Sequence, residues 1–102
     1  SFMKAEELLK DVRNYLDITY EDAEGDKKLI GIIARGMKHL DEIAGKELDY
    51  QPEDQPRALL LDYCRYARNN VLELFEGNFQ AELIALRTGV QTDEYAKTNG
   101  FI

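Results

Sequence analysis

The stretch "DKKLIGIIARGMKHLDEIAG", residues 26–45, carries the pattern that decides the fold. Its apolar residues recur at the spacing of a helix with one buried face, and charged side chains occupy the opposite face. Gly45 suits the left-handed residue that ends a helix. Gly36 lies on the apolar face, where its missing side chain would let another helix approach closely despite a helix-propensity cost of about 1 kcal/mol. The apolar positions are Leu29, Ile33, Gly36, Met37, Leu40, Ile43 and Ala44.

The segments on either side of this helix show the same periodicity, so we predict an all-α protein: a small bundle of about four helices with a long central helix and an irregular C-terminal tail. Ser1 and Phe2 precede Met3, and we interpret them as an expression remnant. A single domain should span residues 3–89, followed by a flexible tail over 90–102. The expected elements are a first helix over 5–16, an acidic loop over 17–26, a polar connection over 46–56, a third helix from Pro56 to about Glu76, and a fourth helix over 79–87, capped by Asn78 and ended by Gly89.

The composition favours a soluble globular protein and disfavours several other classes. Of the 102 residues 44% are hydrophobic and 32% charged, and the formal net charge is −7. A protein of this charge repels the phosphate backbone at long range, so nonspecific capture of DNA is disfavoured. No apolar run approaches the roughly 20 residues of a membrane span, and the N-terminus lacks the parts of a signal peptide. The single cysteine fits a reducing compartment, so we expect an intracellular protein.

Two stretches and two single residues suggest chemistry but lack what that chemistry requires. The acidic loop places Lys27 and Ile33 where a calcium-binding loop needs glycine and a carboxylate. In "GIIARGMK", Met37 stands where a phosphate-binding loop needs lysine. Cys64 lies on the most apolar line of the third helix, where a cysteine is usually inert packing, and His39 has no second metal ligand near it in the sequence. We therefore expect no enzymatic activity, no catalytic or metal site and no cofactor.

The predicted third helix is apolar over more than half of its circumference, so it is either central or meets another subunit along one flank. Arg68 and Asn70 interrupt this surface, and burying either without a partner would cost about 1–3 kcal/mol. Two interpretations stay open. In the first, the Arg68 side chain extends to water and Asn70 bonds a neighbouring backbone group. In the second, the flank is an interface with another subunit, where arginine and tyrosine are enriched. The candidate interface residues on this helix are Tyr63, Tyr66, Arg65, Arg68 and Asn70.

Three stretches together resemble a known family. "LLKDVRNYLDI", "DKKLIGIIARGMKHLDEIAG" and "RALLLDYCRYARNNVLELFEGNFQAELIALR" are similar to the small head-tail connector proteins of tailed bacteriophages. These are also called head completion or adaptor proteins and are common in prophages of Gram-positive bacteria. The resemblance covers residues 8–87. It rests on patterns rather than on catalytic signatures, and the "DYCRYARNN" to "NFQ" part looks particular to one branch.

The resemblance implies a structural adaptor that assembles as a dodecameric ring on the portal protein and extends the DNA channel towards the next head completion or tail protein. An acidic channel would let DNA slide through without specific binding. The expected location is the virion head-tail junction, and the host cytoplasm during assembly, with no membrane contact and with the free protein able to exist as a monomer. The tail over 90–102 becomes either a docking arm anchored by Tyr95, Phe101 and Ile102 or a disordered terminus. The alternative from another class is a small helical module that regulates a protein partner in the host cytoplasm.

Overall fold

The computed structural model describes the backbone of residues 2–98 and the side chains of residues 2–89, and every regular element in that range is a helix. The all-α prediction is therefore confirmed. The elements, with η marking a 3-10 turn, are η1 (Ala5–Leu8), α1 (Leu9–Tyr15), α2 (Ala23–Ala44), α3 (Gln55–Arg68), η2 (Leu72–Leu74), α4 (Phe75–Asn78) and α5 (Gln80–Thr98). None of the described helices has the length and apolar character that crossing a bilayer requires.

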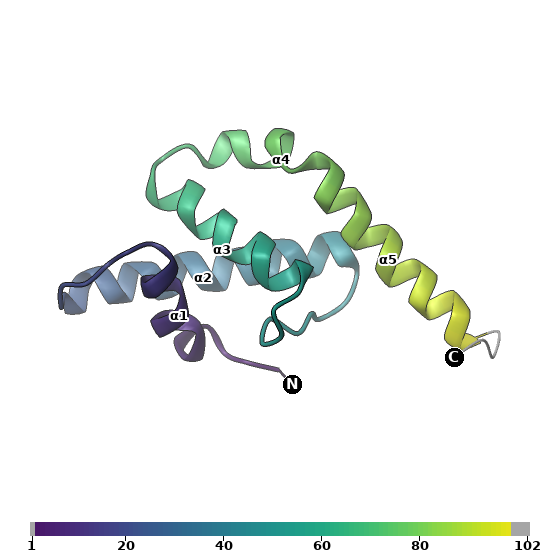
Figure 1. Cartoon of the computed structure of the whole chain (residues 1–102), viewed down its shortest axis with the longest axis horizontal. Helices are drawn as coiled ribbons and strands as arrows, with labels where there is room; N and C mark the ends of the chain where they lie inside the picture. Colours follow the sequence, from purple (N-terminus) through teal and green to yellow (C-terminus); the bar gives the residue numbers. More distant parts are fainter. Residues whose placement is uncertain (1, 99–102) are drawn as a thin grey trace.

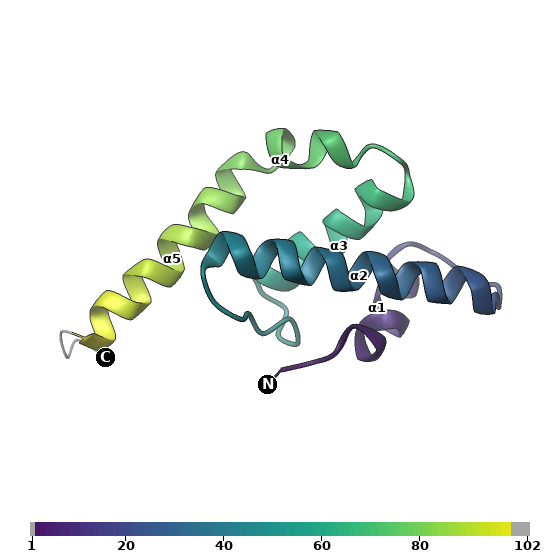
Figure 2. The same cartoon turned by 180° about the vertical axis from the view of Figure 1, so that it is seen from behind.

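The longest helix is α2, which runs through the middle of the molecule with α3 and the N-terminal helices packed along it (Figures 1 and 2). Its buried residues are Leu29, Ile33, Gly36, Leu40 and Ala44, which lie on the face that the periodicity predicted. Gly45 ends the helix in the left-handed conformation, with a φ of 78°, as predicted. The start differs, because α2 already begins at Ala23. Acidic residues in this first turn lie at the positive end of the helix dipole.

The packing of α3 on α2 depends on Gly36. A Cβ atom at this position would lie 2.7 Å from Cδ1 of Tyr63 and 2.8 Å from Cδ1 of Leu60, both closer than carbon atoms normally approach. The two helices therefore come together at the one point on the buried face of α2 where a side chain is missing. The predicted role of Gly36 as a packing glycine is confirmed.

The prediction of a long third helix is correct at its start and wrong at its end. Asp54 accepts a hydrogen bond from the backbone N–H of Gln55 at 2.8 Å, and Pro56 lies in the first turn. The helix stops at Arg68, however, rather than near Glu76. Asn70 is left-handed, with a φ of 59°, and asparagine tolerates that conformation better than most residues. The chain then turns, and η2 and α4 fold back over α3 (Figure 1).

The end of the chain also differs from the prediction. Asn78 is the last residue of α4 rather than the cap of a fourth helix, and α5 begins at Gln80. Gly89 does not end α5, which continues to Thr98, so residues 90–98 are helical where we expected an irregular tail. Residues 99–102, with Phe101 and Ile102, lie outside the described part of the chain. Figures 1 and 2 show α5 running outward from the body of the molecule.

Candidate functional site

Cys64, the candidate nucleophile that the sequence disfavoured, is fully buried in the core. Burial raises the pKa of its thiol from 9.0 to about 12, so the group stays protonated at neutral pH and is a poor nucleophile. His39 is half-buried, and its Nε2 lies 2.9 Å from Oε1 of Glu76. Within the described residues no three histidine, cysteine, aspartate or glutamate side chains gather in a way that could hold a metal ion.

The two candidate interface tyrosines belong to an aromatic cluster inside the chain. Tyr63 packs edge-on against Phe75, with ring centroids 5.5 Å apart, and Tyr66 contacts both Phe75 and Phe79. The Tyr66 hydroxyl accepts a hydrogen bond from Nδ2 of Asn78 at 2.9 Å. Tyr63 is only 7% exposed, so little of it is left for a partner in this conformation. This cluster holds η2 and α4 against α3.

The polar candidates lie at the surface of the same region. Arg65 is exposed, pairs with Asp62 at 3.2 Å, and has its guanidinium 4.9 Å from the centre of the Tyr66 ring. Arg68 is exposed and donates a hydrogen bond to the Tyr20 hydroxyl at 3.2 Å. Asn70 is also exposed and forms the turn after α3. Neither Arg68 nor Asn70 is a buried polar group in need of a partner. Tyr95 lies in α5, where only the backbone is described.

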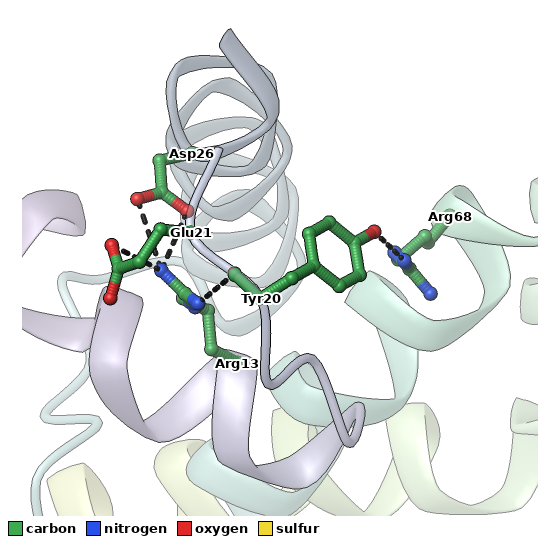
Figure 3. A network of polar contacts seen from close by, with 5 residues as sticks. All are labelled: Arg13, Tyr20, Glu21, Asp26 and Arg68. Carbon is green, nitrogen blue, oxygen red and sulfur yellow. Dashed lines mark hydrogen bonds and ion pairs between the residues drawn. The ribbon is translucent and has the colours of Figure 1, made fainter. Parts of the chain in front are cut away.

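A polar network joins the loop before α2 to three helices (Figure 3). Nη1 of Arg13, on α1, lies 3.1 Å from both carboxylate oxygens of Asp26, on α2, and 3.9 Å from Oε2 of Glu21. Nη2 of Arg13 donates to the backbone carbonyl of Tyr20, whose hydroxyl reaches Arg68 at the end of α3. The acidic loop before α2 is therefore fixed in part by one arginine.

The polar connection between α2 and α3 is anchored in the core by two of its residues, at the place where the sequence allows a short extended piece. Leu48 and Tyr50 are buried, and the Tyr50 hydroxyl lies 2.7 Å from Oδ1 of Asp41. Burial, and then the hydrogen bond with Asp41, raise the pKa of Tyr50. The same carboxylate oxygen accepts from the backbone N–H of Leu48 at 3.1 Å. The signal in the sequence was the alternation of Leu48 and Tyr50 with polar residues, which suits an extended segment with one buried side.

Arg57 joins the same connection to the first helix. Its Nη2 lies 2.9 Å from Oδ2 of Asp11, on α1, and its Nη1 donates to the backbone carbonyl of Tyr50 at 3.2 Å. Its Nε lies 3.1 Å from Oε1 of Glu53. The hydrogen bond with Asp11 raises the pKa of Arg57, so the guanidinium remains charged and ties three segments of the chain together.

The molecule is extended rather than spherical. Its radius of gyration is 14.7 Å and its principal extents are 50, 29 and 18 Å, whereas a compact domain of this length has a radius of gyration of about 13 Å. The last buried residue described on α5 is Leu86. Gly89 still lines a pocket with residues of the connection between α2 and α3, and the C-terminal end of the helix runs away from the other elements in both views (Figures 1 and 2). Large apolar side chains also remain exposed on the body, namely Phe2, Tyr15, Tyr20, Leu74 and Ile84.

Comparisons of the chain with protein-family models, with curated proteins and with solved structures found no match.

Proposed function

We propose that the chain is a structural adaptor of a phage or prophage head-tail junction. In this proposal, copies of the chain assemble as a dodecameric ring on the portal protein, extend the DNA channel and receive the next head completion or tail protein. The proposal starts from the family resemblance of residues 8–87, and the all-α fold is compatible with it. Its mechanism is assembly, so it requires surfaces that contact other subunits rather than a catalytic centre.

The observation that best supports an assembly role is the course of α5. A helix that packs on its own domain at one end and projects from it at the other offers its projecting end to other molecules. Because helices in proteins gain most of their stability from packing, such an end suits a contact with a partner. The C-terminal end of α5 extends away from the body (Figure 1). A neighbouring subunit or the portal could cover this part. The charge of −7 suits a channel wall that repels phosphate, provided that acidic residues face the channel.

Co-sedimentation tests this proposal against the regulatory alternative. The purified chain is mixed with portal rings of the phage or prophage whose genome encodes it, and the mixture is separated on a density gradient. We expect the chain to migrate with the portal rings and to stay at the top of the gradient without them. A chain that stays at the top in both cases, while it is retained by an immobilised host protein, would contradict the adaptor function and support the regulatory module.

A further inference from the structure

The outer face of α2 concentrates positive charge in a protein that is otherwise strongly acidic. Residues 27–40 contain four basic side chains and no carboxylate: Lys27, Lys28, Arg35 and Lys38. Without these four charges the net charge of −7 would become −11. At about 100° per residue the four side chains fall within one sector of roughly 100°, on the side away from the buried residues. Glu24 and Glu42 fall in the same sector and bound the strip, one turn before Lys28 and one turn after Lys38. All four are exposed, and together they form what we call the basic strip.

The basic strip is not neutralised by ion pairs within the molecule. Among the described side chains, none of its four members forms an ion pair. Glu42, Glu73 and Glu76 line a groove with Arg35 and Lys38, and Glu76 is already in contact with His39. The strip is about 17 Å long from its first to its last member, at about 1.5 Å per residue. It is therefore long enough to contact several charges on a partner.

A complementary surface lies on the connection between α2 and α3. Residues 47–54 contain four carboxylates and no basic residue: Glu47, Asp49, Glu53 and Asp54. We call this segment the acidic connection. Glu53 pairs with Arg57 and Asp54 caps α3, whereas Glu47 is exposed and Asp49 accepts a hydrogen bond from a backbone N–H. The connection turns back beneath the C-terminal half of α2 (Figure 1), where the Tyr50 hydroxyl bonds the backbone carbonyl of Met37. The strip lies along the N-terminal and middle parts of the opposite face of that helix.

We propose that the basic strip of one copy docks on the acidic connection of the next copy. This inference rests on the proposed function and names the contact between neighbouring subunits. Since two different surfaces meet, the contact is heterologous, and such a contact closes into a ring when the rotation between copies permits it. A second copy suits the strip better than a nucleic acid does, because a charge of −11 on the remaining residues repels phosphate at long range.

Charge reversal of each surface, alone and together, tests this contact. One variant carries Lys27→Glu and Lys38→Glu, and a second carries Glu47→Lys and Asp49→Lys. A matched control carries Lys4→Glu and Lys10→Glu, which change the net charge by the same amount outside the strip. Self-association at low salt is measured by sedimentation velocity, without portal, for the wild type, for each variant and for the equimolar mixture of the two variants.

We expect the wild type and the control to associate in a salt-sensitive way and each reversed variant to associate about tenfold more weakly, the size of losing two exposed ion pairs. The mixture, and a chain that carries all four substitutions, should recover association because every contact again joins opposite charges. The proposal would be overturned if the mixture of the two reversed variants failed to recover association, or if the wild type did not associate at all. Binding of duplex DNA that depends on the strip would also overturn it. A self-associating chain that ignores portal rings would instead refute the proposed function alone.

Discussion

Replacing Gly36 by alanine tests the closest helix contact in the molecule. The new Cβ would lie 2.7 Å and 2.8 Å from carbons of Tyr63 and Leu60. Neither side chain can easily move, because both are buried and the Tyr63 ring packs against Phe75. Overpacking of this kind costs about 1–3 kcal/mol, and the better helix propensity of alanine returns about 1 kcal/mol. The net loss of unfolding free energy should therefore be about 0–2 kcal/mol.

The same substitution at Gly31 serves as the internal control. Gly31 lies in the same helix, and a Cβ there would meet only the end of the Arg35 side chain, at 3.5 Å. Gly31→Ala should therefore gain about 1 kcal/mol. Urea unfolding followed by circular dichroism gives both free energies, and the difference between the two variants isolates the packing cost. Equal stability of Gly36→Ala and Gly31→Ala would refute the close approach of α2 and α3.

Four further predictions concern the core, the turn after α3 and the C-terminal segment. Arg57→Gln should lower the unfolding free energy by about 1–3 kcal/mol, because three segments lose their shared partner. The control Arg65→Gln removes an exposed ion pair and should cost at most about 1 kcal/mol. Urea unfolding measures both losses. Asn70→Val should be destabilising by about 1–2 kcal/mol, because valine disfavours the left-handed conformation, and Asn70→Gly should be close to neutral in the same assay. The pKa of the Cys64 thiol is about 12 in the folded state and 9.0 ordinarily, so as the pH rises the thiol ionises first in the unfolded chain. The stability advantage of the wild type over Cys64→Ala should therefore shrink between about pH 9 and about pH 12. An advantage independent of pH would contradict the raised pKa. Deletion of residues 90–102 should leave the unfolding midpoint unchanged, because the end of α5 runs outward from the other helices (Figures 1 and 2). The same deletion should abolish co-sedimentation with portal rings; retained co-sedimentation would remove the proposed docking role of this segment.

Features set by short-range sequence rules were predictable. The buried face of α2 and its end at Gly45 follow from periodicity and from the tolerance of glycine for a positive φ. The start of α3 at Gln55 follows from Pro56 in its first turn, where the missing N–H of proline is no loss. The inert setting of Cys64 follows from its place on an apolar line. In each case the deciding residues lie within a few positions of the feature.

The end of α3 was not predictable in this way, because it depends on residues that follow it by several positions. The apolar pattern continues past Asn70, and extrapolating it gave a helix to about Glu76. The chain instead turns at Asn70, which brings Phe75 and Phe79 back onto Tyr66. A break costs helical hydrogen bonds but buries Phe75 almost completely, and burial of a phenylalanine contributes about 1.5–3 kcal/mol. Tertiary packing therefore overrode the local pattern.

This error also changed the candidate site. On an uninterrupted helix, Arg68 and Asn70 would lie on an apolar flank without partners of their own. An interface with another subunit would supply those partners, which made the two residues interface candidates. With the helix ended, Arg68 bonds Tyr20 and Asn70 forms the turn, while Tyr63 faces the core. The basic strip was present in the sequence, but its charges read as the ordinary solvated face of an amphipathic helix. That its four basic residues follow one another along one face, between Glu24 and Glu42, became apparent only once the solvent face of α2 was fixed.

The most direct test of the adaptor function is electron microscopy of negatively stained portal rings after incubation with the purified chain. We predict an added layer of density on the tail-facing end of each ring, with the rotational symmetry of the portal. Portal rings that remain bare at saturating concentrations of the chain would contradict the adaptor function.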